Sequence, residues 1–271
     1  MGFDISYHPV KESDMRNWFF DLDFTAIADN DFSGIEPVVK QYQLDEFFID
    51  KYKDILAVAV QTPPGDSFEN SYGYYMAVIQ GLMDKYFYTR GSAYSFMMQD
   101  MPYFKAYTKP WADILTDKYE NPTYNQINQN YSSGVYIPAD MVVKLLHDYN
   151  TDENIKRDMD NFYSHGRIDI FMKALEYAMH SNAGILEATE VVEPNPLDLN
   201  QTVCYSNLLN CDIEGAILYQ QAAQEQLREY ETRENLPEGE IARNATYQKT
   251  TIPPPPAPKT EKKGFFKRLF G

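Results

Sequence analysis

The residues best suited to chemistry gather in one stretch, from Gly184 to about Tyr230. It contains both cysteines of the chain, three glutamates and an acidic loop interrupted by two prolines. It is also the least helix-like part of a sequence in which helical spacing dominates. Binding and catalytic groups tend to sit on irregular backbone that a rigid scaffold carries. This stretch is therefore the first place to look for a site, although nothing in it matches a catalytic signature.

None of the four histidines belongs to a recognised metal or acid–base motif; they are His8, His147, His165 and His180. A hydrolytic metal needs about three His or carboxylate ligands that converge on one point, and no pair here has a spacing such as HExxH. The last three fall at or near predicted helix C-termini, where the helix dipole favours an imidazolium. His8 alternates with Asp4 and Ser6 on the polar face of a predicted strand, which indicates a solvated edge. The sequence therefore predicts no metal ligand.

Cys204 and Cys211 have the spacing C-x6-C, which is neither the redox C-x-x-C nor a zinc knuckle. Cys211 precedes a predicted helix N-terminus, where the dipole lowers the pKa of a thiol. A pairing with His8 or His180 would give a hydrolase-like site near the 187–211 loop, whereas buried, inert thiols are the commoner arrangement. No GxSxG, GxGxxG or GxxxxGK motif occurs, so we predict no catalytic residue and no nucleotide cofactor.

Charge limits the classes of partner. The 271 residues carry a net charge of −16. Residues 259–271 hold five basic side chains and one acidic one, which leaves −20 on the other 258 residues. A body this acidic repels nucleic acid and anionic membranes and attracts basic partners. We therefore expect a basic protein partner and no nucleic acid.

The N-terminus has no basic region followed by an apolar run, so it does not read as a signal peptide. No stretch approaches 18 consecutive apolar residues, the length that a transmembrane helix requires. These features predict a cytoplasmic protein with reduced thiols.

Periodicity predicts a mainly α fold with a small β-sheet, of the α+β class. Apolar spacing indicates helices over 15–22, 44–59, 72–87, 138–149, 151–163 and 168–179, and from 213 onwards. Strands are predicted over 2–8, 134–137 and 185–192. Residues 1–235 should form one globular domain, 236–258 a polar and Pro-rich linker, and 259–271 a basic amphipathic tail.

Tyrosine is concentrated in the middle of the chain, where twelve of the 22 lie between Tyr72 and Tyr136. Tyrosine offers contact area and a polar tip at a small entropy cost, so it is enriched at interfaces. Alternatively, the rings pack loops onto the core. The predicted partner-binding residues of the body come from this region and from the acidic loop: Tyr94, Tyr103, Tyr107, Tyr124, Glu187, Glu190 and Glu193.

The C-terminal tail is predicted to dock on a membrane surface or a partner. In a helix, Phe265, Phe266, Leu269 and Phe270 share one face, opposite Lys267 and Arg268. Exposed apolar clusters usually mark contacts. The tail segment of seven residues is too short to form a helix alone in water, so we expect it to become helical only when it docks.

Three segments, GFDISYHP, EVVEPNPLDLN and CYSNLLNCD, resemble an uncharacterised bacterial protein family. The resemblance implies no activity, cofactor or site residue.

Together, these features favour an acidic cytoplasmic protein that binds a protein partner, for example by neutralising a basic toxin as bacterial immunity proteins do. The alternatives are the hydrolase-like enzyme and a scaffold held at the membrane by its tail.

Overall fold

The computed structural model describes residues 3–62, 68–115, 125–127 and 129–244. Contacts divide the chain into two compact units, Met1–Gln226 and Leu227–Gly271. The first unit contains the sheet and both hydrophobic cores. The predicted boundary at residue 235 falls inside the second unit.

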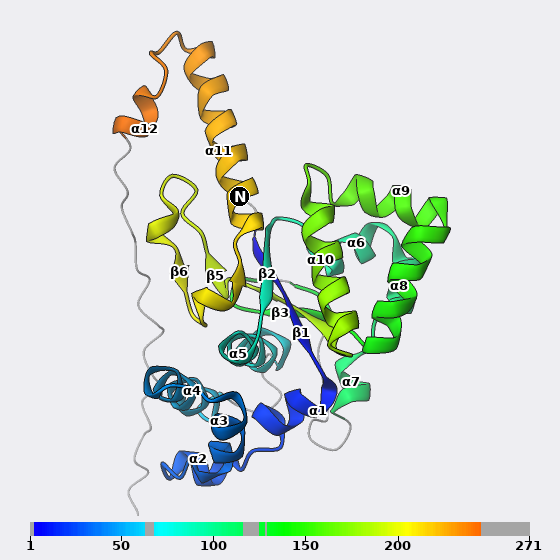
Figure 1. The fold of residues 1–271 in the computed structure, drawn as a ribbon, viewed down its shortest axis with the longest axis vertical. Helices are drawn as coiled ribbons and strands as arrows, with labels where there is room; N and C mark the ends of the chain where they lie inside the picture. Colours follow the sequence, from blue (N-terminus) through cyan, green and yellow to red (C-terminus); the bar gives the residue numbers. More distant parts are fainter. Residues whose placement is uncertain (1–2, 63–67, 116–124, 128, 245–271) are drawn as a thin grey trace, which may run out of the picture. The chain divides into compact units, whose positions relative to one another are not determined.

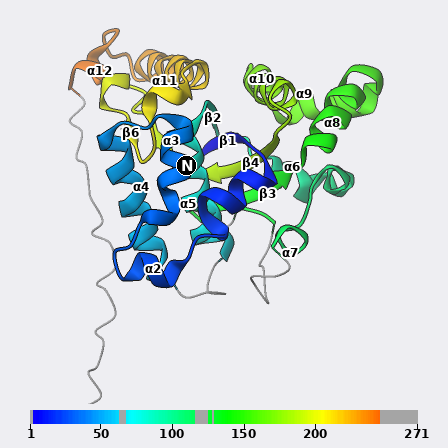
Figure 2. The same ribbon diagram turned by 60° about the horizontal axis from the view of Figure 1, so that its bottom comes forward.

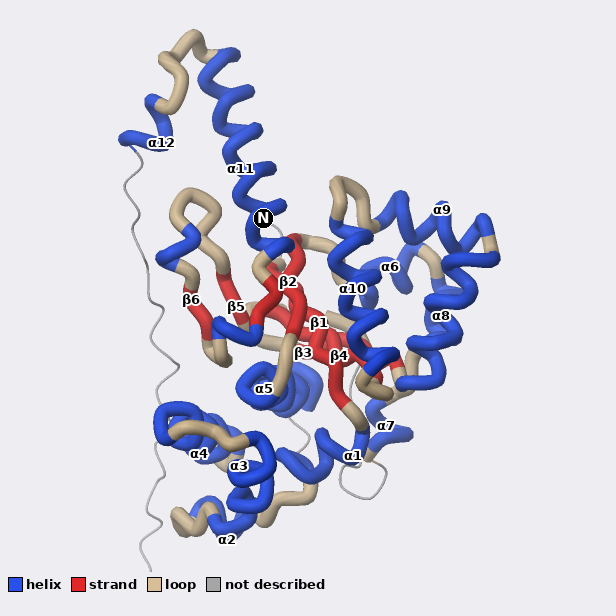
Figure 3. Tube along the Cα trace, viewed as in Figure 1, coloured by secondary structure: helices blue, strands red, loops and turns tan. Residues whose placement is uncertain are grey.

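A five-stranded mixed sheet organises the first unit (Figure 1, Figure 3). Its order is β3 (Ser133–Ile137), β4 (Gly184–Thr189), β1 (Asp4–Val10), β2 (Tyr86–Arg90) and β7 (Cys211–Asp212). β1 is the middle strand and pairs antiparallel with both β2 and β4. β3 also runs antiparallel to β4, whereas β7 is parallel to β2. The mainly α fold with a small sheet is confirmed.

Helices cover both faces of the sheet (Figure 1, Figure 2). One face packs against α5 (Phe68–Met83), which contacts β1, β3 and β4. The opposite face packs against α6 (Tyr94–Asp100), α8 (Ala139–Thr151) and α10 (Arg167–His180).

The remaining elements are short or lie outside these layers. Before α5 come α1 (Glu12–Met15), the π-helical turn η1 (Arg16–Phe20), α2 (Phe24–Ala28), η2 (Ser33–Ile35), α3 (Glu36–Tyr42) and α4 (Glu46–Ala59). The middle of the chain adds η3 (Pro102–Tyr107), α7 (Trp111–Ile114) and α9 (Glu153–Phe162). The last part adds β5 (Val192–Glu193), η4 (Leu199–Gln201), β6 (Val203–Cys204), η5 (Leu208–Asn210), α11 (Glu214–Arg233) and α12 (Glu240–Asn244). α12 lies within the stretch predicted as a linker.

Two separate hydrophobic cores lie on the two sides of the sheet. Along β1, Ile5 and Tyr7 enter the core beneath α10, and Val10 enters the core beneath α5. Every residue of β1 is buried. The prediction of a half-buried strand that ends at Pro9 was therefore wrong in burial and in its end, since β1 continues through Pro9 to Val10.

The predicted helix over 72–87 is also wrong at its C-terminal end. α5 ends at Met83, and Tyr86–Arg90 forms β2 beside the central strand. In β2, Tyr86 and Tyr88 enter one core and Phe87 enters the other. The first three residues of β2 are aromatic and buried on its two faces, so this strand shows no polar alternation. These residues could therefore be mistaken for the last turn of the preceding helix.

Gly215 provides a test of how α11 joins the sheet. A Cβ built at Gly215 would lie 1.7 Å from the carbonyl oxygen of Tyr88, a backbone atom that cannot turn away. Gly215→Ala should therefore force α11 away from β2 and lower the free energy of unfolding by about 1–3 kcal/mol, the usual cost of overpacking. Urea denaturation measures this change.

Gly34→Ala is the matched control, because the added Cβ would meet only Leu22 Cδ2 at 3.5 Å, an ordinary contact. Equal stability of the two variants would contradict the close packing at Gly215.

Candidate functional site

Among the described residues of the first unit, the most exposed large apolar side chain, that of Leu209, lies on the turn that links β6 to α11. This turn begins at Cys204, includes the 3-10 turn η5 and ends at Glu214. Within this turn, Asn207 accepts a hydrogen bond from the amide of Leu209 at 3.0 Å, at the start of η5. The side chain of Asp212 similarly accepts from the amide of Glu214 at 3.1 Å, at the start of α11.

Hydrogen bonds to α5 and α4 hold this turn on the helical layer. Ser206 Oγ donates to the carbonyl oxygen of Val78 at 2.6 Å, and Asn210 Nδ2 donates to that of Gly81 at 3.0 Å. Lys51 Nζ donates to the carbonyl oxygen of Ser206 at 2.6 Å. Because the polar side chains of the turn bond α5 and Lys51 of α4 bonds its backbone, the backbone of the turn is fixed and its apolar side chains are left on the outside.

Leucine and isoleucine side chains project from this anchored turn. Leu209 is 90% exposed, Ile213 is 58% exposed and Leu208 is 45% exposed. Single exposed apolar residues are common on proteins, but a group of them on a rigid turn usually marks a contact.

A cavity of about 470 Å³ lies beside the exposed leucine. Leu209 and Ile213 line it together with the carboxylates of Asp84, Asp212 and Glu214 and the ammonium of Lys85. We call these six residues the Leu209 surface. Lys85 Nζ lies 2.9 Å from the carboxylate of Asp212 and Glu214 pairs with Lys173, so part of the acidic charge is balanced internally. An apolar tip beside three carboxylates suits an apolar contact flanked by a basic side chain.

The three predicted glutamates do not form one surface. Glu187 is in β4 and is 1% exposed, and Glu190 is 6% exposed after that strand, so neither presents its carboxylate to a partner. Glu187 accepts hydrogen bonds from the amides of Ser95 and Val135. Glu193 is partly exposed in β5 and accepts a hydrogen bond from Tyr131 at 3.1 Å. Helices cover both faces of β4, which explains the burial of Glu187. Glu190 follows the strand and accepts a hydrogen bond from the amide of Asp4 at 3.4 Å.

The predicted tyrosines also separate. Tyr94 is fully buried and donates to the carbonyl oxygen of Phe104 at 3.0 Å, and Tyr107 is 5% exposed and donates to Asp148 at 2.6 Å. Tyr103 is 48% exposed and donates to Asp158. The alternative interpretation, rings that pack loops onto the core, therefore applies to Tyr94 and Tyr107. Tyr124 lies outside the described residues.

His8 is not on a solvated edge, as the sequence suggested, but is completely buried in the central strand. Its Nδ1 lies 2.7 Å from Gln80 Oε1, and its Nε2 lies 2.8 Å from Ser6 Oγ. Gln80 Nε2 donates to the carbonyls of Pro9 and Lys85, which fixes Oε1 towards the ring, so Nδ1 carries the proton and Nε2 accepts from Ser6. Burial lowers the pKa of His8 to about 4.

This chain of serine, imidazole and carboxamide resembles a nucleophile, its base and an orienting group. However, Ser6, His8 and Gln80 are each at most 1% exposed, so a substrate has no path to their atoms. Their hydrogen bonds satisfy polar groups between the sheet and α5.

Cys211 is not an activated thiol. Burial raises its pKa to about 12, which outweighs any effect of the nearby helix N-terminus. Cys204 Sγ lies 3.3 Å from the hydroxyl of Tyr86, and both cysteines are free thiols. His180 is exposed at the end of α10, where its Nδ1 lies 2.7 Å from the carbonyl oxygen of Glu176. The structure therefore does not bring a cysteine, a histidine and a glutamate together as the hydrolase alternative requires.

Two findings concern only the described part of the chain. No group of three His, Cys, Asp or Glu side chains within it is arranged to hold a metal ion. None of its helices combines the length and hydropathy that a membrane-spanning segment needs. The tail residues Phe265, Phe266, Leu269 and Phe270 lie outside the described residues.

Leu209 and Ile213 were not selected from the sequence, although they lie in the stretch singled out there. The available signal was the pair Leu208-Leu209 between Asn207 and Asn210. Two apolar residues in a turn flanked by asparagines follow no helix or strand period, so nothing assigned them to a core.

The buried carboxyl of Glu187 gives a pH test. Burial raises its pKa from 4.5 to about 7, although its hydrogen bonds to Ser95 and Val135 act in the opposite direction. The folded protein therefore holds this proton over a range where the unfolded chain has lost it. Its contribution to stability is fully present below pH 4.5 and is lost as the pH rises through about 7, a change of roughly 3 kcal/mol.

Glu187→Gln keeps the neutral form at every pH. The free energy of unfolding of the natural protein minus that of the variant should fall by this amount between pH 4.5 and 8, measured by urea denaturation. Taking the difference removes the effects of other titrating groups such as His8. A difference that stays constant with pH would mean that Glu187 is not held protonated.

Comparison with known proteins does not assign this chain to a family. The chain matches no protein-family model, no curated protein and no solved structure.

Proposed function

We propose that this is an acidic cytoplasmic binding protein that captures a basic protein partner on the Leu209 surface. The observation that carries the proposal is Leu209, 90% exposed on a turn that α5 holds in place. Burying a leucine side chain contributes about 1.5–3 kcal/mol. A surface that offers this apolar group without first having to order its backbone binds at a lower entropic cost.

Charge supports a basic partner. The chain has a net charge of −16, and three carboxylates lie beside the apolar tip. In the proposed complex a basic side chain of the partner lies beside Asp84, Asp212 and Glu214 and shares the last two with Lys85 and Lys173. Rim charges of this kind mainly raise the association rate and exclude partners of the same sign. Neutralisation of a basic toxin, as by immunity proteins, is one form that such capture takes.

The test removes the apolar tip without changing the charge. Leu209→Ser combined with Ile213→Ser should reduce the amount of basic protein that the immobilised chain retains from a lysate of its native cell by at least tenfold. This expectation follows from the free energy of burying one leucine side chain. Quantitative mass spectrometry of the retained proteins measures the loss.

Val58→Ser combined with Val143→Ser is the matched control, because these valines are 51% and 50% exposed on α4 and α8. The control should retain the partner. Equal loss in both variants, or full retention by the Leu209 variant, would contradict the proposal.

Salt provides an independent measure once a partner is isolated. The association rate should fall as ionic strength increases, because steering by exposed charges is screened over about 8–10 Å at 0.10–0.15 M salt. A rate unchanged from 20 mM to 500 mM salt would contradict capture by charge while leaving the apolar contact in place.

A further inference from the structure

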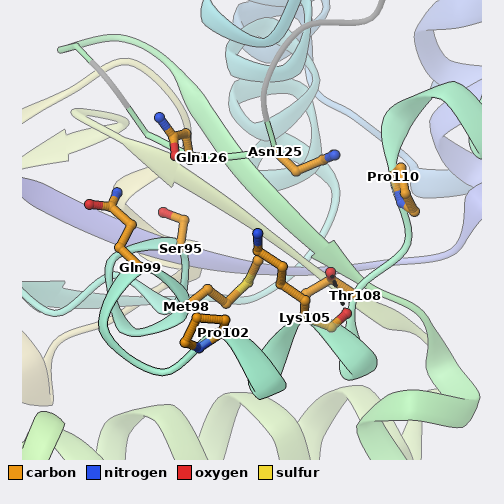
Figure 4. Close-up of a pocket in the computed structure, with 9 residues that line it drawn as sticks. All are labelled: Ser95, Met98, Gln99, Pro102, Lys105, Thr108, Pro110, Asn125 and Gln126. Atoms are coloured by element: carbon orange, nitrogen blue, oxygen red, sulfur yellow. Dashed lines mark hydrogen bonds between the residues drawn. The ribbon is translucent and has the colours of Figure 1, made fainter.

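A second cavity, of about 450 Å³, lies on the α6 side of the sheet (Figure 4). Its described lining residues come from α6, η3, the residues after η3 and the segment before β3; they are Ser95, Met98, Gln99, Pro102, Lys105, Thr108, Pro110, Asn125 and Gln126. Binding sites for small molecules typically have volumes of about 300–1,000 Å³ and mainly apolar walls with a few polar groups. This cavity shares no residue with the Leu209 surface.

Lys105 supplies the positive charge of this cavity. Elsewhere Lys85 and Lys109 pair with the carboxylates of Asp212 and Glu12, at 2.9 and 2.7 Å. Lys105 forms no ion pair with any residue that the structure describes. None of the described lining residues is acidic, although Asp and Glu account for 40 of the 271 residues. Among the described lining residues, the charge is therefore positive on an acidic protein.

Carboxamides complete the polar lining. Figure 4 shows Asn125 and Gln126 across the opening from Lys105 and Thr108. Asn125 Oδ1 accepts the amide proton of Trp111 at 3.1 Å, which leaves its Nδ2 group as a donor. Gln99 and Gln126 offer further N–H donors, and an anion needs donors of this kind around its oxygens.

The inner wall of the cavity is rigid because Ser95 is fixed from behind. Ser95 is 1% exposed, its amide donates to Glu187, and its hydroxyl accepts from the amide of Ile127 at 3.3 Å. The carboxyl of Glu187 occupies the space next to Gly134, where a Cβ would lie 2.0 Å from Oε2. This packing keeps Ser95 in place whether or not the cavity is filled.

We propose that this cavity binds a small organic carboxylate. The carboxylate lies at Lys105 and the carboxamides, and the apolar body of the ligand packs on Met98 and Pro102, which lie together in Figure 4. The positive charge of Lys105 favours an anionic head group. The apolar wall favours an anion with a hydrocarbon body, which binds more tightly there than a simple inorganic ion.

Benzoate, benzamide and inorganic phosphate separate these two requirements. Each is titrated into the full-length protein while backbone amide NMR shifts are followed. Benzoate should shift amides within 95–110 and 125–127 saturably. Benzamide, which has the same shape without charge, should bind at least threefold more weakly, and so should phosphate, which lacks the apolar body.

Variants of Lys105 test the contact. Lys105→Met should weaken benzoate binding about fivefold, as expected for an exposed ion pair of up to ~1 kcal/mol, and Lys105→Arg should restore most of the affinity. Lys53→Met is the control, because Lys53 is a surface lysine of α4 that pairs with Asp50.

Several outcomes would overturn the proposal. They are shifts that scatter over the protein or do not saturate, equal binding of benzamide or phosphate, and equal loss of affinity in the Lys53 control. Failure here would leave capture at the Leu209 surface untouched, because the two tests use different residues and different ligands.

Discussion

The burial of β1 on both faces is the constraint on which the rest of the first unit depends. A middle strand between two helical layers cannot leave polar side chains to water, so each must find a partner inside. His8 is bound by Gln80 from α5 and by Ser6 from its own strand. Asp4 pairs with Arg90 and accepts from Tyr88, both in β2. These bonds fix the position of β1 relative to α5 and β2, because a shift of one residue would place its polar side chains in the wrong core.

Burial also changes what the acidity of the sequence means. Some of the carboxylates are internal, and those at Glu187 and Glu190 have raised pKa values because burial penalises their charged forms. Net charge alone therefore does not show where a basic partner would bind. The charge that can act on a partner is the part that remains at the surface without an internal counter-charge; at the Leu209 surface, Asp212 and Glu214 already pair with Lys85 and Lys173.

The two proposed sites rest on the same physical arrangement. In each, a segment is fixed to the layered body by its own polar groups, which leaves other side chains free to meet a ligand. Ser206 and Asn210 hold the β6–α11 turn on α5, and Ser95 is held by Glu187 and Ile127. The first arrangement exposes an apolar tip beside carboxylates. The second exposes a lysine beside carboxamides.

The fold class and the strongly amphipathic helices could be predicted from the amino-acid sequence. The apolar stripe of α4, for example, follows from local periodicity. That residues 86–90 are a strand, that His8 is buried and that Leu209 is exposed became visible only in the folded chain. In each case the deciding partner is distant along the chain, as Gln80 is from His8 and Val78 is from Ser206. Local patterns record which side chains are polar or apolar, but burial depends on what packs against them, and that is fixed when the sheet and helices assemble.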